Sequence, residues 1–225
     1  MLLLHEDEHI LVIHKPAGLL TVGTGREQDR TVFVIIANYL RKSQPKSRKK
    51  IFLVHRLDRE TSGVLVVAKS EQAKVCLQQK WKGTEKTYQA VVEGHCKKKS
   101  DTITSYLAEN SAHVVYSTPD RKKGKLSHTA YTVLRQAKDC ALLEIKLLTG
   151  RKNQIRVHLA DIGHPIVGDK KYGNGGRGRW QLALHAKSIS FTHPTTGERL
   201  YFEAEVPPFF EHLLNRGRHS PERNY

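Results

Sequence analysis

The sequence predicts an α+β fold in which a mixed, largely antiparallel β-sheet is flanked by helices. Apolar segments of strand length outnumber helical ones, and several neighbouring strands are joined by short turns, such as the one at 193–197. No linker and no internal repeat interrupts the chain. We therefore expect one domain over residues 1–214, followed by a polar, basic tail at 215–225 that frays.

The expected strands are short runs that are rich in β-branched residues or that alternate with period two. They are residues 10–13, 51–54, 64–68, 86–93, 103–108, 113–116, 130–134, 141–148, 182–191 and 199–205. Three helices are expected: one capped by Thr31 that runs to about Arg41, one from Glu71 to Trp81 that is capped by Ser70, and one from Arg151 to Ile162. Their inward faces should carry Val32, Ile35, Ile36, Tyr39 and Leu40, then Ala73, Cys76, Leu77 and Trp81, and finally Ile155, Leu159 and Ile162.

The charge of the chain is unbalanced, with 38 Lys and Arg residues against 22 Asp and Glu residues and a net charge of +16. Such an excess favours a polyanionic partner, and nucleic acid more than a membrane surface. No apolar run approaches the ~20 residues of a membrane span. The three widely spaced cysteines argue against a disulfide framework. We expect a cytoplasmic protein.

A polar loop, His55 to Gly63, lies between two apolar runs in the middle of the first half of the chain. Loops on a rigid scaffold often carry chemistry. Asp58 is flanked in sequence by Arg56 and Arg59, so we expect this carboxylate to be ionised at neutral pH. Taken alone, the loop is more simply interpreted as a charged surface hairpin.

Two other segments carry side chains that could take part in catalysis or binding. Lys86-Thr87-Tyr88 places a phenol on a strand face, although a lone tyrosine is usually a core residue. Thr149 to Arg156 ends a strand and starts a helix, where backbone N–H groups and two arginines favour an anion. Arg156 lies about 100° of helix rotation from the core-facing Ile155, at an edge where a buried carboxylate can meet it.

The loop HRLDRETSG followed by VLVVAK resembles the signature of the RluA-type RNA pseudouridine synthases. Four further blocks resemble this family in the same order over residues 4 to about 208. They are ILVIHKPAGLL, EKTYQAVVEG, TGRKNQIRVHLADIGHPIVGDKKYG and LALHAKSISFTHPTTGE. Five blocks in order are a specific signal, whereas one alone is not. The resemblance implies the pseudouridine synthase fold.

The family reaction breaks the glycosidic bond of a uridine in RNA, rotates the uracil and rejoins it through carbon 5, without metal or cofactor. By resemblance, Asp58 is the essential carboxylate, and it either attacks the sugar or removes a sugar proton. Arg156 is its expected guanidinium partner. Tyr88 matches the tyrosine that packs against the uracil, and Arg56 matches the residue that takes the place of the flipped nucleotide.

The same blocks imply that His55, Arg151, Asn153 and Gln154 also contact the substrate. Asn153 departs from the family pattern, because the family usually has His at this position. Asn donates and accepts hydrogen bonds but carries no proton charge near neutrality. We interpret this position as one that tunes the site.

The expected partner is ribosomal or transfer RNA, held by four basic runs at 41–50, 97–99, 121–125 and 170–179. The family pattern begins at about residue 4, so we expect no additional N-terminal RNA-binding domain. We also expect a monomer.

Three alternatives stay open at this point. A non-catalytic RNA-binding module or chaperone would share the fold and the charge, but the intact Asp58 argues against it. A phosphodiester-cleaving enzyme would need a carboxylate pair or a histidine pair at a recognised spacing, and none is found. Thirteen histidines suggest a metal site, yet pairs such as His158 and His164 lack zinc-site spacing, so we expect no metal.

Overall fold

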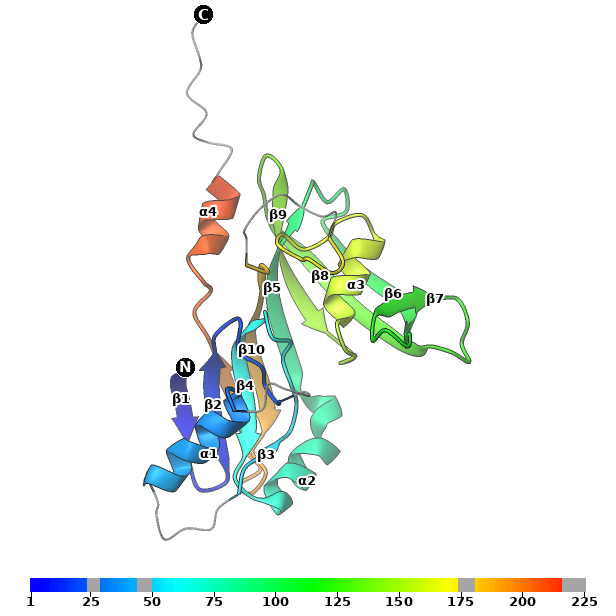
Figure 1. Cartoon of the computed structure of the whole chain (residues 1–225). Coiled ribbons are helices and arrows are strands. Elements are labelled where there is room, and N and C mark those ends of the chain that lie inside the picture. Colours follow the sequence, from blue (N-terminus) through cyan, green and yellow to red (C-terminus); the bar gives the residue numbers. More distant parts are fainter. Residues whose placement is uncertain (24–28, 44–49, 174–180, 216–225) are drawn as a thin grey trace, which may run out of the picture. The chain divides into compact units, whose positions relative to one another are not determined.

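The computed structural model describes residues 1–23, 29–43, 50–173 and 181–215 (Figure 1). The chain divides into two compact units. Unit 1 comprises Met1–Lys86 and Ala186–Glu205, and unit 2 comprises Thr87–His185 and Val206–Tyr225. The domain boundaries expected from the sequence stay a prediction, and the tail at 216–225 lies outside the described residues.

In unit 1 the strands follow the order β1, β2, β4, β10, with β11 beside β10 and β3 beside β4. The pairs β1–β2, β2–β4, β3–β4 and β10–β11 are antiparallel. The strands are β1 (Leu2–Glu6), β2 (Ile10–Lys15), β3 (Phe52–Leu53), β4 (Ser62–Ala68), β10 (Leu184–Thr192) and β11 (Arg199–Glu203). Every residue of β4 is buried, which explains its unbroken apolar run.

Two helices belong to unit 1, namely α1 (Val32–Ser43) and α2 (Glu71–Gln79), the latter followed by a 3₁₀ turn at Trp81–Gly83. Thr31 and Ser70 cap them as expected, since Val34 N–H donates to Thr31 Oγ1 at 3.2 Å and Ala73 N–H donates to Ser70 Oγ at 3.1 Å. Residues of α2 pack with apolar residues of the strands in one core cluster. Its members are Ile10, Val12, Val64, Val66, Ala68, Ala73, Leu77, Ile189, Phe191 and Ala204.

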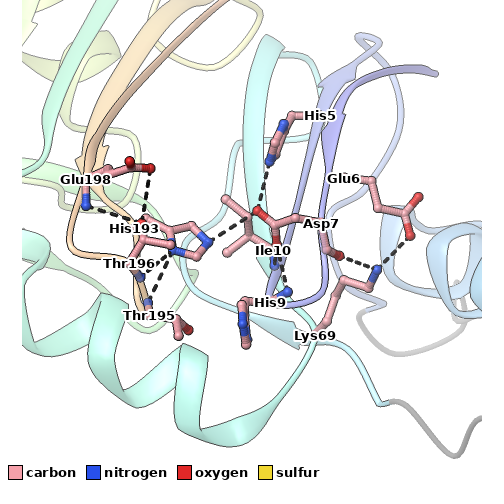
Figure 2. Close-up of polar contacts among 10 residues, drawn as sticks. All are labelled: His5, Glu6, Asp7, His9, Ile10, Lys69, His193, Thr195, Thr196 and Glu198. Atoms are coloured by element: carbon pink, nitrogen blue, oxygen red, sulfur yellow. Dashed lines mark hydrogen bonds and ion pairs between the residues drawn. The ribbon is translucent and has the colours of Figure 1, made fainter.

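Asp7 organises the turn between β1 and β2 (Figure 2). Its Oδ1 accepts the backbone N–H groups of His9 and Ile10 at 2.7 and 2.8 Å, and its Oδ2 lies 2.9 Å from His5 Nε2 and 3.2 Å from His193 Nε2. Burial opposes ionisation, but the bonds from His5, Ile10 and His9 and the nearby His193 lower the pKa of Asp7 to about 2. The buried Lys69 ammonium donates to the Asp7 carbonyl at 2.6 Å.

Unit 2 is an antiparallel sheet in the order β5, β9, β8, β6, β7. The strands are β5 (Glu85–Glu93), β6 (Ser100–Glu109), β7 (Val115–Thr118), β8 (Lys125–Gln136) and β9 (Cys140–Leu147). Helix α3 (Gln154–Asp161) lies beside β6 and β8 (Figure 1), and Val157 packs with Leu107 and Val115 in a small core cluster. Helix α4 (Phe209–Asn215) buries Phe210, Leu213 and Leu214.

The prediction of an α+β fold with largely antiparallel strands is confirmed. Some details were wrong. The run at 51–54 forms only a two-residue, half-buried strand, and β1 and α4 were missed. On the predicted helix faces, Ile35, Tyr39 and Ile162 are exposed. Among the described helices, none has the length and apolar character needed to cross a membrane.

Gly63, at the start of β4, provides a test of backbone packing. It has φ +118°, and a Cβ at this position would lie 2.2 Å from the Ala186 carbonyl oxygen. We expect Gly63→Ala to lower the free energy of unfolding by about 3 kcal/mol or more, since a strained φ and an overpacked contact add together. Urea unfolding measures this.

The matched control is Gly18→Ala, because Gly18 also has a positive φ (+82°) but has open space where the Cβ would be. We expect it to cost only about 1 kcal/mol. Equal losses for the two variants would contradict the packing argument.

Candidate active site

The segment that follows β2 forms hydrogen bonds with the backbone of the loop that carries Asp58. Thr21 Oγ1 donates to the Leu57 carbonyl at 2.8 Å, and its oxygen accepts the Leu57 N–H at 3.3 Å. Gly18 N–H donates to the Arg59 carbonyl at 2.9 Å. Leu57 is buried whereas Asp58 is half-buried. The backbone on both sides of the carboxylate is therefore fixed.

Lys15, the last residue of β2, is completely buried below this loop. Its ammonium donates to three carbonyl oxygens, those of Pro16 at 2.9 Å, Leu19 at 2.7 Å and Arg59 at 3.0 Å. Burial lowers its pKa to about 8, and the nearby carboxylates of Glu60 and Asp58 act in the opposite direction. At neutral pH the ammonium is thus charged, with all three donors used.

His55 and Arg56 precede Asp58 and differ in environment. Val66 N–H donates to His55 Nε2 at 3.0 Å, and the imidazole lies 4.9 Å from the Trp81 ring. Burial, with a smaller contribution from Lys86, lowers the pKa of His55 to about 3, so the ring is neutral. Arg56 is exposed. His55 thus has a structural function within unit 1, and its predicted contact with substrate stays a prediction.

In unit 2, Tyr88 lies on β5 opposite Ile145 of β9 and is 8% exposed. The alternation expected for this strand is only partly observed, because Val91 is buried together with Ala90 and Val92. Tyr88 is itself buried, and the pairing of β5 with β9 fixes its position in the sheet.

The segment before α3 adopts a turn that the sequence did not reveal. Asn153 has φ +52° and ψ +16°, which is the left-handed region that Asn tolerates better than most residues. The helix consequently starts at Gln154 and not at Arg151 as predicted. Gln154 is buried, and its Oε1 accepts the Arg151 N–H at 3.0 Å and the Thr149 hydroxyl at 2.9 Å.

Gln154 ends a buried chain of hydrogen bonds that runs through His158. Gln154 Nε2 donates to Thr129 Oγ1 at 2.9 Å, and His158 Nδ1 lies 2.9 Å from the same hydroxyl. On the other side, His158 Nε2 lies 3.0 Å from Ser105 Oγ. Burial lowers the pKa of His158 to about 4, although Asp161 opposes the shift, so His158 is neutral.

Arg156 forms a two-point ion pair with Asp169. Its Nε and Nη2 lie 2.7 Å from Oδ2 and Oδ1 of this carboxylate, respectively. The Arg156 side chain is 12% exposed and that of Asp169 is fully buried. Burial raises the pKa of Asp169, but the Arg156 guanidinium and the amides of Tyr172 and Lys171 together outweigh it, so the net shift is downward. The carboxylate expected to meet Arg156 was Asp58, and sequence reasoning did not foresee the pair with Asp169.

The predicted site residues thus fall into two groups. His55, Arg56 and Asp58 share one loop of unit 1, and Tyr88, Arg151, Asn153, Gln154 and Arg156 belong to unit 2. Within unit 2, Gln154 directly binds the backbone of Arg151. Arg156 belongs to unit 2 and Asp58 to unit 1, and their expected pairing stays a prediction.

Sequence reasoning missed several residues that support these groups, namely Lys15, Thr21, His158, Asp169 and Tyr172. Lys15 and Asp169 each lie in a segment that resembles the family. The signal that could have identified them is a charged residue directly after an apolar run or within a turn. Among the described residues, no cluster of three or more His, Cys, Asp and Glu side chains could hold a metal ion.

Comparison with solved structures defines the class of protein. The fold aligns with Human RNA Pseudouridylate Synthase Domain Containing 4 at a TM-score of 0.81 and 25% identity, over 96% of this chain and 93% of that one. It also aligns with Human RNA Pseudouridylate Synthase Domain Containing 1 at a TM-score of 0.74 and 25% identity, over 99% and 96% of the two chains. This is the fold of RNA-modifying isomerases.

Sequence relatives agree with this class. An uncharacterized RNA pseudouridine synthase of Bacillus subtilis is 37% identical over 94% of this chain and 70% of its own length. The ribosomal large subunit pseudouridine synthase C of Escherichia coli is 36% identical over 97% and 70%. The family model described as RNA pseudouridylate synthase matches residues 9–161. The chain belongs to this family, whose activity is the isomerisation of uridine in RNA to pseudouridine.

The neutral, buried His158 makes stability depend on pH. In the unfolded chain this histidine takes up a proton below about pH 6.5, whereas the folded protein resists protonation down to about pH 4. As the pH falls from 6.5 to 4, the free energy of unfolding should therefore fall, with a His158 contribution of about 3 kcal/mol. Urea unfolding at several pH values measures the slope.

His158→Gln removes the titrating group and should flatten this slope between pH 6.5 and 4. The control is His113→Gln, because the His113 side chain is 83% exposed. A slope that is unchanged in His158→Gln would contradict the assignment.

Proposed function

We propose that this protein isomerises uridines of large-subunit ribosomal RNA to pseudouridine, with Asp58 as the essential carboxylate. The observation that carries the proposal is the fixed backbone on both sides of Asp58, with a charged Lys15 beneath the loop. Preorganised groups of this kind lower the barrier because they need no rearrangement during the reaction. The choice of ribosomal RNA is supported by the names of relatives in Escherichia coli and Zymomonas mobilis.

The reaction is balanced without an oxidant or co-reactant. The bond from the sugar C1′ to uracil N1 breaks and a bond from C1′ to C5 forms, while C5 loses a proton and N1 gains one. The Asp58 carboxylate acts on the sugar, either as a nucleophile at C1′ or as a base. Tyr88 packs against the uracil, and the exposed Arg56 fills the space that the flipped nucleotide leaves.

The residues at the start of α3 are proposed to bind the substrate and to orient its charged groups. Arg151 is exposed, and its backbone is held by Gln154, which suits contact with a phosphate. Asn153 carries no proton charge, so a proton shuttle at this position is not part of the mechanism. Its amide oxygen lies 3.2 Å from the Tyr172 hydroxyl, which suggests that it tunes the shape of this segment.

Substitution of Asp58 tests the proposal directly. We expect Asp58→Asn to lower the rate of pseudouridine formation by about 10³-fold or more, because a neutral amide is neither a base nor a nucleophile. RNA from cells that lack the gene is incubated with the protein, and pseudouridine is mapped by mass spectrometry.

Glu60→Gln is the matched control, since Glu60 is an exposed carboxylate of the same loop, and it should retain activity within about threefold. If wild type and Asp58→Asn leave identical RNA, the protein is a binding module or chaperone and the enzyme assignment fails.

The binding of RNA should depend strongly on salt. Residues 97–99 are exposed, and so are residues 121–125 except for the half-buried Gly124. The structure describes only part of the runs at 41–50 and 170–179. Phosphate contacts release counterions, so the logarithm of affinity should fall linearly with that of salt concentration between about 50 and 200 mM.

Replacing Lys97 and Lys99 together with Gln should reduce this slope by about 0.7–0.9 for each phosphate group that is no longer neutralised. Lys138→Gln, an exposed lysine outside the four runs, is the control and should leave the slope unchanged. An affinity that does not vary with salt would rule out the electrostatic contribution.

A further inference from the structure

We propose that Asp169 is a positioning residue of this enzyme, which sets the orientation of the Arg156 guanidinium for catalysis. The inference rests on the proposed function and deepens it, because it names a residue that supports a proposed site residue without contacting the substrate. It is drawn from the geometry of three residues in unit 2, namely Arg156, Asp169 and Tyr172.

The ion pair between Arg156 and Asp169 determines the plane of the guanidinium. Two parallel bonds, from Nε to Oδ2 and from Nη2 to Oδ1, are each 2.7 Å long. Bidentate pairs of this type fix direction as well as distance. With both Nε and Nη2 in defined positions, the direction in which Nη1 points is also defined.

Asp169 is itself held in place by backbone hydrogen bonds, so it can position the Arg156 side chain. Its Oδ1 accepts the backbone N–H groups of Lys171 at 2.9 Å and Tyr172 at 3.0 Å, and its own N–H donates to the Ile166 carbonyl at 3.0 Å. Gly173 N–H donates to the Asp169 carbonyl at 3.0 Å, and a Cβ on Gly173 would lie 2.4 Å from that oxygen. The turn from 169 to 173 therefore permits little movement of the carboxylate.

Tyr172 limits movement of the guanidinium perpendicular to its plane. The Arg156 Cζ lies 5.1 Å from the centre of the Tyr172 ring, within the range of a cation–π contact. The ring is anchored through its hydroxyl, which accepts the Val115 N–H at 3.2 Å and donates to Asn153 Oδ1 at 3.2 Å. The Asp169 carboxylate thus fixes the plane of the Arg156 guanidinium, and the Tyr172 ring limits its movement out of that plane.

A purely stabilising role explains this arrangement less well. Buried ion pairs add little net stability, because desolvation of both charges offsets their attraction, and apolar pairs of equal volume often serve as well. An oriented guanidinium beside a reacting group is different, because a displacement of about 1 Å can lower a rate by about 100-fold. The Asp169 pair therefore suits the catalytic role proposed for Arg156.

The test is a double-mutant cycle between Asp169→Asn and Arg156→Gln. In either orientation of the Asn amide, its NH₂ group faces an N–H donor of Arg156, at Nε or at Nη2, so the guanidinium must shift. The single-turnover rate of pseudouridine formation is measured with excess enzyme on RNA from cells that lack the gene. RNA affinity and urea unfolding are measured for each variant.

We expect Asp169→Asn to lower the single-turnover rate by about 100-fold and to change RNA affinity by less than about threefold. In the Arg156→Gln background the same substitution should cause little further loss, because the two residues act together. Glu211→Gln is the matched control and should stay within about twofold of wild type. Glu211 also pairs with an arginine, Arg135, at 2.9 Å, and both residues lie outside the four basic runs.

If Asp169→Asn does not fold, the cycle is carried out with Asp169→Glu, which retains the charge but displaces it, and an intermediate loss of about tenfold is expected. A folded Asp169 variant with wild-type rate, or losses that multiply in the double mutant, would overturn the inference and leave the proposed function intact. A wild-type protein that forms no pseudouridine would instead overturn the proposed function, and the inference with it.

Discussion

The three hydrogen bonds of the Lys15 ammonium are the interaction on which the Asp58 loop depends. The ammonium is fully buried, and the carbonyl oxygens of Pro16, Leu19 and Arg59 replace the water molecules that it would have in solution. Two segments that lie about 44 positions apart in sequence are joined through this one charge. Because carbonyls buried without a donor are costly, the loop can hardly leave this position without unfolding part of unit 1.

The same principle operates in unit 2 with neutral groups. Gln154, Thr129, His158 and Ser105 form a chain of hydrogen bonds that connects the start of α3 to strands β6 and β8. A satisfied polar network inside a sheet and helix layer specifies one arrangement, since any shift would leave several groups unpaired. The substrate-binding residues proposed at the start of α3 thus rest on a rigid base, even though Arg151 itself is exposed.

Charged groups in both units are fixed by backbone amides as much as by other charges. Asp7 accepts two backbone N–H groups from the turn between β1 and β2. Asp169 accepts two backbone N–H groups from residues 171 and 172, which follow it in the chain. In each case a carboxylate stabilises a turn and presents its remaining lone pairs to a cationic or titratable partner. A turn so held is a suitable place for a residue that must orient another one.

The sequence alone determined the class of fold and singled out the loop with Asp58 as the candidate site. The unbroken apolar run of β4, the caps Thr31 and Ser70, and the loop with Asp58 follow from local patterns, because burial and capping act over a few residues. The tertiary structure decided what local patterns cannot specify. Asn153 takes a left-handed conformation and delays α3, Ile162 and Tyr39 stay exposed, and Arg156 finds Asp169. These outcomes depend on contacts between residues that are distant in sequence, and periodicity contains no information about such partners.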